Sequence, residues 1–300
     1  MNLKTAHQPY RQLPEILSVF LQTLTIGSYS FLFLITFLTF ETDPFEARFE
    51  LFKRSLPYIG FGGILVLVIL YLIQKQETWR QKGSSSIIHF LRENEVDGFG
   101  LFALLLTGSM GLRLVHIDLT ILYFITFLAA VFALLQMTRF YTFYSGRPSW
   151  NHPSTAGSLI QGTILLGASS GLWVLSDPSL NRLLIWICAA FLLIEGLTIW
   201  NRFRFLSRAN VITRQSAMMM LGSHLTLFGV RFIFGLAMPL VYFAWYLFVR
   251  ELPLHPALLM IVVGELSERI LFFITALPYS PPEHFPEGQS HQNGETHHEV

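Results

Sequence analysis

Eight apolar segments follow one another along the chain, each of about the 20 residues that a transmembrane helix needs to cross a bilayer core of ~30 Å. This pattern predicts an all-α, polytopic membrane protein with a bundle of about eight transmembrane helices. The fifth segment carries Gly167 and Gly171 at a four-residue spacing, so we expect its backbone to approach a neighbouring helix closely. The predicted spans cover residues 17–40, 56–73, 98–115, 119–140, 156–175, 180–200, 228–248 and 257–277.

The composition favours the same class of protein. Hydrophobic residues make up 52% of the 300 and charged residues only 13%, whereas a soluble domain carries about 25% charged residues. The net charge of +1 gives no reason to expect a nucleic acid partner. The single cysteine, Cys188, lies within an apolar segment, which excludes a disulfide framework and a cysteine-ligated iron–sulfur cluster.

The division of the chain follows from these segments. Residues 1–277 are predicted to form one eight-helix transmembrane domain. The first apolar segment lacks a small-residue cleavage pattern and is too long for a signal-peptide core, so we count it as a span. Residues 278–300 are rich in Pro, Glu, His and Gly and are predicted to be a disordered polar tail. The tail histidines could bind a metal, but a solvated tail is the simpler interpretation.

Basic residues are distributed unequally between the two sets of loops. The loops on the side of the N-terminus hold about twice as many Lys and Arg residues as the loops on the other side. Cytoplasmic loops of membrane proteins carry the excess of Lys and Arg. We therefore expect both termini in the cytoplasm, with the protein in a bacterial inner membrane.

Polar side chains within the predicted spans gather in one leaflet. Ionisable groups at bilayer depth are costly and usually mark a pathway, a ligand site or an internal ion pair. Glu265 and Arg269 are one helical turn apart, so they could simply pair with each other. Clustering across several helices favours instead a polar pocket that is reached through the lipid. The residues concerned are Gln22, Arg139, Gln161, Glu195, Arg231, Glu265, Glu268 and Arg269.

The loop between the fourth and fifth spans lies on the same side and has an unusual composition. Residues 139–155 read RFYTFYSGRPSWNHPST. Aromatic and basic side chains at such a junction are typical of the headgroup level of a bilayer. Arg139, Tyr141 and Trp150 could also bond to and stack on a flat polar ligand, so both interpretations stay open.

The histidines exclude one class of redox protein. A bis-histidine haem needs paired histidines within the spans. All ten histidines of this chain lie in loops, at predicted helix edges or in the tail. We therefore expect no haem. The chain also lacks a nucleotide-binding loop and a cluster of metal ligands inside the membrane.

Two motifs resemble those of a known family. The first is the 139–155 segment, with arginine, tyrosine, proline, tryptophan and threonine ahead of a helix. The second is Gly264-Glu265-Leu266 followed by Arg269, Phe272 and Phe273. Together they are similar to the membrane-anchor subunits of dimethyl sulfoxide reductase-type molybdoenzyme complexes. The first span, with Pro14, Phe20, Gln22 and Gly27, fits that family more loosely, and the resemblance covers essentially the whole chain.

The resemblance implies a non-catalytic, quinol-reactive anchor subunit. Its partners would be an iron–sulfur electron-transfer subunit and a molybdopterin catalytic subunit, besides membrane lipid. Its ligand would be quinol or quinone, with menaquinone expected, and this chain would hold no iron–sulfur cluster or molybdenum of its own. The quinol-binding residues implied or suggested are Glu95, Arg139, Tyr141, Trp150, Glu265 and Arg269.

Two positions depart from the family pattern. The family's histidine after the second helix falls at Gln81, and a glycine in the last helix is replaced by Glu268. His89 or Glu95 could replace the missing proton acceptor. A proton-coupled transporter that uses Glu195, Arg231 and Glu265 as its relay is an alternative, and a purely structural anchor is another. Transporters often show internal repeats and broken helices, and neither is evident in this sequence.

Overall fold

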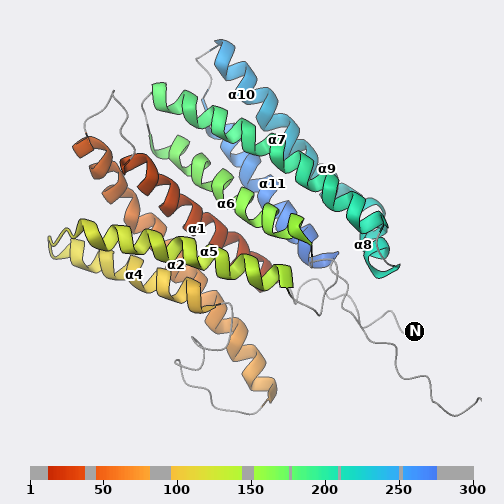
Figure 1. Ribbon diagram of the computed structural model, residues 1–300, viewed down its shortest axis with the longest axis horizontal. Helices are drawn as coiled ribbons and strands as arrows, with labels where there is room; N and C mark the ends of the chain where they lie inside the picture. The colour runs from red at the N-terminus through yellow and green to blue at the C-terminus, as the bar shows by residue number, and fades with distance from the viewer. Residues whose placement is uncertain are drawn as a thin grey trace, which may run out of the picture.

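The computed structural model describes residues 13–37, 45–81, 96–143, 152–175, 178–208, 211–249 and 253–275. Within these ranges the chain forms helices and no strands, and the long helices run side by side in a bundle (Figure 1). The predicted tail at 278–300 lies outside the described residues. The elements are α1 Leu13–Phe37, α2 Phe45–Gln81, α4 Val96–Leu114, α5 Thr120–Phe143, α6 Pro153–Val174, α7 Pro178–Arg208, α8 Val211–Leu221, α9 Leu225–Phe232, the π-helical turn η3 Ile233–Ala237, α10 Met238–Val249 and α11 His255–Ile274.

Each of the eight predicted apolar segments overlaps a helix or the continuous run α9–η3–α10, and α2 and α7 extend beyond the spans that they contain. The start of α6 has a clear local cause. His152 is the extended N-cap residue and accepts a hydrogen bond from the backbone N–H of Ser154, while Pro153 occupies the first turn, where its missing N–H is not needed. Between α4 and α5, His116 adopts a positive φ of 61°.

The predicted spans leave residues 201–227 as a connection between the sixth and seventh spans, and the structure differs there. α7 continues to Arg208 and is followed by the short helix α8. Residues 201–208 contain no Gly or Pro, so nothing in the sequence stops the helix at the end of the apolar run. Leu206 of α7 packs against Ala217 and Met220 of α8, which explains why this region folds back on itself.

The helices form two groups. α1, α2, α4 and α5 enclose one apolar core, which contains Tyr29, Phe52 and Phe102. α6, α7, α10 and α11 enclose a second core, where the buried thiol of Cys188 packs as a small hydrophobic side chain. The groups meet where α1 packs on α6 (Figure 1).

Glycines allow that contact. A Cβ atom on Gly27 would overlap the carbonyl oxygen of Thr163, and one on Gly167 would overlap the carbonyl oxygen of Gly27. The two backbones therefore touch. The close approach predicted for Gly167 is confirmed, with Gly27 of α1 as its partner.

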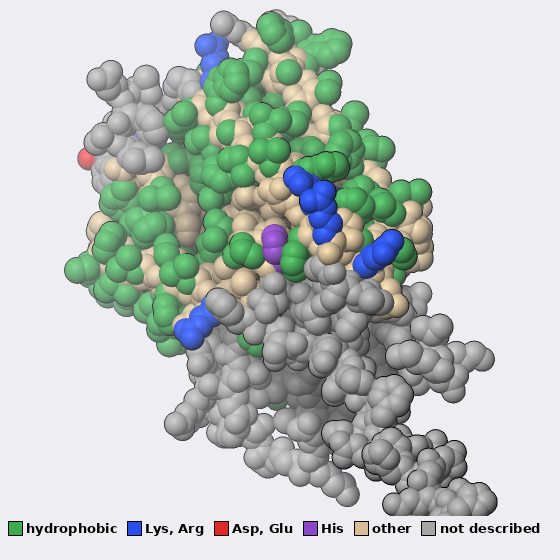
Figure 2. Space-filling view, turned by 45° about the vertical axis from the view of Figure 1, so that its right-hand side comes forward, with side chains coloured by type: hydrophobic (Ala, Val, Ile, Leu, Met, Phe, Trp, Pro, Cys, Tyr) green, Lys and Arg blue, Asp and Glu red, His purple; other side chains and the backbone are tan. Residues whose placement is uncertain are grey.

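The outer surface is apolar. Large hydrophobic side chains such as Tyr58, Ile121 and Phe248 are between 69% and 87% exposed, while several arginines and glutamates are buried. Figure 2 shows one face covered mainly by hydrophobic side chains, with few charged ones among them. A soluble protein rarely exposes apolar patches of this extent, so the surface is that of a membrane protein.

Among the described residues, five helices are long and apolar enough to cross a membrane. They correspond to α1, α2, α5, α7 and the run α9–η3–α10, and α4 is a shorter apolar helix. α6 is rich in Ser, Thr and Gly, and α11 carries three charged residues. The structure thus supports a helical membrane protein, whereas the predicted count of eight spans goes beyond these five.

The end of the bundle where α4 meets α5 is held by an ion-paired cluster. Lys53 of α2 lies 3.1 Å from Asp118 and 2.5 Å from Glu50, and the Tyr123 hydroxyl donates to Asp118 at 3.0 Å. Burial tends to raise the pKa of Asp118, but the hydrogen bonds from Lys53 and Tyr123 outweigh it and hold that pKa below its usual value. The carboxylate therefore stays charged and fastens the α4–α5 loop to α2.

Candidate functional site

Six charged side chains from α7, α9 and α11 meet in the interior of the bundle beside α6. All six are buried, with exposed fractions from 0% to 6%. They lie toward the end of the bundle where α5 and α11 end and α6 begins. We call this set the charge network; its members are Glu195 and Arg202 of α7, Arg231 of α9, and Glu265, Glu268 and Arg269 of α11. Three carboxylates face three guanidiniums, so the formal charges cancel.

Arg231 is the centre of the network. Its Nη2 atom pairs with Glu195 and donates to Glu265 Oε1 at 3.3 Å. Its Nε atom lies 3.5 Å from Glu268 Oε2. One guanidinium therefore neutralises carboxylates on two different helices and links α7, α9 and α11.

Glu265 extends the network to α6. Its Oε2 atom accepts from Arg269 Nη2 at 3.4 Å, which confirms the predicted pair one turn apart, and Arg269 Nη2 also lies 3.3 Å from the Ser158 carbonyl oxygen. A Cβ atom on Gly162 would collide with both Arg269 and Glu265. Gly162 therefore makes the space in α6 that the ion pair fills.

Glu268 extends the network toward the bundle end. Its Oε1 atom accepts from Ser158 Oγ at 3.2 Å and from Arg202 Nη1 at 3.3 Å. The Arg202 guanidinium also lies over the Phe272 ring, 4.8 Å from its centroid. A narrow crevice lined by Arg202, Phe203 and Glu268 opens beside the network.

The turn after Arg231 is π-helical, and a pair of glycines accompanies it. In η3 the backbone of Gly235 touches the backbone of Gly264 in α11, and a Cβ atom on either residue would overlap the other. π-helical turns within α-helices frequently occur at functional sites. Here the turn and the glycine contact bring α9 close enough to α11 for Arg231 to reach Glu265 and Glu268.

Aromatic side chains cover the network at the bundle end. Tyr141 of α5 is 4% exposed and packs edge-on against Phe272 and Phe273 of α11. His152 stacks on Phe205 with ring centroids 4.1 Å apart. Burial, and then the positive charge of Arg202, lower the pKa of His152, so its ring is neutral at pH 7 and can accept the N-cap hydrogen bond.

The structure brings together only some of the predicted site residues. Glu265 and Arg269 are paired within the network, and Tyr141 lies in the adjoining aromatic cluster. Arg139 is exposed and lies about 200° around α5 from Tyr141, so it points away from that cluster. Glu95 and Trp150 lie outside the described residues.

Sequence reasoning missed Arg202, Ser158 and Gly162. Arg202 lies just beyond the sixth predicted span, which ends at residue 200, but it comes seven residues after Glu195 and hence lies on the same face of a helix that continues. Ser158 and Gly162 are four residues apart on α6, which puts them on one face as well. Helical spacing alone could have found Arg202 if the helix end had been placed correctly.

The fold and the network define a helical membrane protein with a neutral set of charged side chains in its interior. Within the described part of the chain, no group of three or more His, Cys, Asp or Glu side chains is arranged to hold a metal ion. No family model matches this chain, and no similar protein was found among curated proteins or solved structures. Chemically, the network offers carboxylates that can accept protons and guanidiniums that can donate hydrogen bonds to an oxygen atom.

Proposed function

We propose that this protein is the quinol-reactive membrane-anchor subunit of a dimethyl sulfoxide reductase-type complex. It crosses the membrane eight times and exchanges electrons between quinol and an iron–sulfur subunit that serves a molybdopterin catalytic subunit. The observation that carries the proposal is the charge network, because it lies at the bundle end near Tyr141 and His152, which belong to the described parts of the 139–155 segment. Glu265 and Arg269 of the network also belong to the second motif that resembles the family.

The energetics of the network support a functional role. Burying a charge pair often stabilises a protein no more than apolar side chains of similar volume would, because desolvation offsets the attraction. Five of the six groups lie within the predicted spans, and a set of this kind is therefore poorly explained by stability alone. Their formal charges cancel, so the site can receive a neutral quinol without leaving a net charge buried.

The chemistry assigned to the site is proton acceptance. Oxidation of a quinol to a quinone releases two electrons and two protons. The electrons pass to the cluster of the partner subunit, and carboxylates such as Glu95 and Glu265 accept the protons. Arg269 holds a ring oxygen by a hydrogen bond, and Tyr141 and Trp150 contact the ring. The exposed Arg139 stands at the mouth of the site and donates a hydrogen bond to a ring oxygen as the quinol enters. The loops at this end of the bundle dock the partner.

Substitutions that leave the fold intact test the proposal. Glu95→Gln and Arg139→Gln should lower quinol-linked turnover of the assembled complex by about tenfold or more, because each removes a proton acceptor or a hydrogen-bond donor. Turnover with an artificial dye, which bypasses the membrane subunit, should be unchanged. Arg139 is exposed, so Arg139→Gln breaks no buried contact among the residues that the structure describes.

The matched control is Arg54→Gln, because Arg54 is an exposed arginine near the start of α2, at the opposite end of the bundle. It should leave both activities unchanged. If quinol-linked turnover survives Glu95→Gln and Arg139→Gln, the quinol site is elsewhere. If the complex dissociates instead, these residues dock the partner rather than bind quinol.

The proposed orientation places both termini and the quinol site on the cytoplasmic side. Its basis is the twofold excess of Lys and Arg in the loops of that side. Alkaline phosphatase fused after Val300 should be inactive, because the enzyme folds only outside the cytoplasm, while a fluorescent protein fused there should fluoresce. The opposite pair of results would reverse the orientation.

A proton-coupled transporter remains the second candidate, and one observation favours it. The π-helical turn η3 directly follows Arg231 in the seventh predicted span, and an irregular helix beside charged groups is common in transporters. The helix nevertheless continues without a break through η3 into α10. Proton uptake by vesicles that contain this chain alone would favour the transporter; copurification with an iron–sulfur subunit would favour the anchor.

A further inference from the structure

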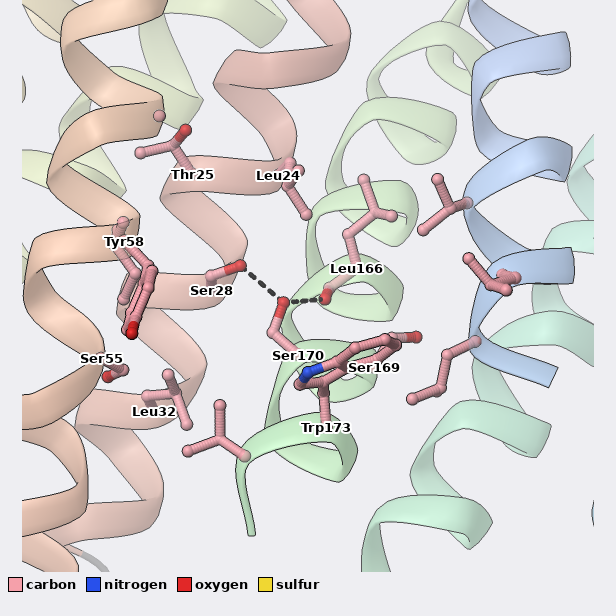
Figure 3. Close-up of a pocket in the computed structure, with 16 residues that line it drawn as sticks. Leu24, Thr25, Ser28, Leu32, Ser55, Tyr58, Leu166, Ser169, Ser170 and Trp173 are labelled. Atoms are coloured by element: carbon pink, nitrogen blue, oxygen red, sulfur yellow. Dashed lines mark hydrogen bonds between the residues drawn. The ribbon is translucent and has the colours of Figure 1, made fainter. Parts of the chain in front are cut away.

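A groove opens on the side of the bundle where the two groups of helices meet. Its volume is about 590 Å³, within the usual range for small-molecule sites. α1 forms its floor, with α2 on one side and α6 and α11 on the other (Figure 3). Tyr58 and Leu259 stand at its exposed rim, and Leu24, Ser28, Ser170 and Trp173 are among the residues that line it.

The lining suits hydrocarbon rather than a polar group. Its five serine and threonine hydroxyls already have partners in the protein. Ser28 and Ser170 bond to each other at 2.6 Å, and Ser170 also donates to the Leu166 carbonyl (Figure 3). Thr25, Ser55 and Ser169 donate to carbonyl oxygens of their own helices. A ligand in the groove therefore meets mainly methyl, methylene and ring carbons, besides the Tyr58 hydroxyl at the rim and the indole N–H of Trp173.

The groove leads toward the charge network along two helices. On α6, Leu166 lines the groove one turn after Gly162, the residue against which Glu265 and Arg269 pack. On α11, Val262 lines the groove three residues before Glu265. Residues three or four positions apart share a helix face. The inner end of the groove thus lies one helical turn from Glu265.

We propose that this groove holds the isoprenoid tail of the quinol while the ring lies at the Glu265 end. The inference rests on the proposed function and adds where the ligand enters and how it lies. A tail gains little hydrophobic free energy on leaving lipid, because lipid is equally apolar. The groove therefore acts by fixing the direction of the tail, which in turn points the ring at the carboxylates.

The charge of the network favours a quinol over a phospholipid. The network is neutral and internally paired, so it can accept the uncharged hydroxyl groups of a quinol ring. A phosphate would bring an unbalanced negative charge to a buried site, at a high desolvation cost. The acyl chain of a phospholipid would also need its headgroup at the membrane surface, beyond Trp173.

Variants that fill the groove test the assignment. Leu24→Trp and Leu259→Trp enlarge side chains of its floor and rim, and Val241→Trp, at a 62% exposed position on α10, is the matched control. The full chain, purified in detergent, is photolabelled with an azido-naphthoquinone that has no tail. Two unlabelled competitors are compared: a naphthoquinone with a long isoprenoid tail and one with only a methyl group.

For the wild type and Val241→Trp, the long-tailed competitor should displace the label at a lower concentration. In Leu24→Trp and Leu259→Trp, the concentration of the long-tailed competitor that displaces the label should rise by about fivefold or more, because the added ring overpacks the groove. The concentration of the methyl compound that displaces the label should stay the same. An unchanged advantage of the long tail overturns the tail assignment and leaves the proposed function standing. If both competitors become weaker by the same factor in these variants, the tail assignment is also overturned. A phospholipid that competes as well as the long-tailed quinone assigns the groove to an acyl chain. If neither quinone displaces the label from the wild type, the tail assignment and the proposed function are both overturned.

Discussion

Arg231→Gln is expected to destabilise the protein by about 3 to 5 kcal/mol, the usual result of breaking a buried ion pair from one side. Arg231 pairs with Glu195, Glu265 and Glu268, and its side chain is 1% exposed. Without it, three buried carboxylates face only two guanidiniums. The midpoint of thermal unfolding in detergent should fall by roughly 10 °C.

A double variant separates charge imbalance from loss of the arginine itself. Glu195→Gln combined with Arg231→Met removes one charge of each sign, so Glu265 keeps Arg269 and Glu268 keeps Arg202. We expect the double variant to recover most of the stability lost in Arg231→Gln, because balanced apolar replacements of buried pairs are often tolerated. If both variants unfold alike, Arg231 stabilises through its packing and not through its charge.

Helix positions could be predicted from the sequence because the signal is continuous and local. An apolar run of about 20 residues allows few structures other than a membrane helix. The sequence also indicates where successive helices are interrupted, at Asp118 between α4 and α5 and at Pro178, which begins α7. The end of α7 was not visible, because hydropathy falls after Trp200 while the helix continues to Arg208. Hydropathy reports the membrane boundary, and the helix extends past it.

The candidate site was predictable in part for the same reason. Threading the spans alternately through a membrane places Glu195, Arg231 and Glu265 at one depth, and the structure brings these three together. Depth does not determine the rotation of a helix about its axis. The expectation that Arg139 joins this cluster therefore had no support from spacing, and its side chain is exposed.

The residues that line the groove could not be predicted from the sequence. The charged side chains suggested an open polar pocket, yet they are buried and paired with one another. The groove lies instead along hydroxyl and apolar residues such as Ser28, Ser170 and Trp173. These residue types are common on any membrane helix, so their gathering depends on how α1, α2, α6 and α11 pack.

Gly264→Val should be at least as damaging as Arg231→Gln, with a loss of about 3 kcal/mol or more or failure to accumulate as folded protein. A Cβ atom at position 264 would overlap the backbone of Gly235 and come within 3.0 Å of Arg231 Nη1. Backbone atoms cannot rotate away as a flexible side chain can. η3 and α11 would have to separate.

Gly229→Ala is the matched control, because Gly229 lies in the same short helix as Arg231 and a Cβ atom there meets open space. It should be neutral or stabilising by up to about 1 kcal/mol, since Ala favours a helix more than Gly does. Both variants are compared by the yield of monodisperse protein and by the midpoint of thermal unfolding. A Gly264→Val protein as stable as Gly229→Ala would mean that α9 and α11 can move apart without loss. The contacts of Arg231 with Glu265 and Glu268 would then not depend on the glycine pair, and the π-helical turn would need another explanation.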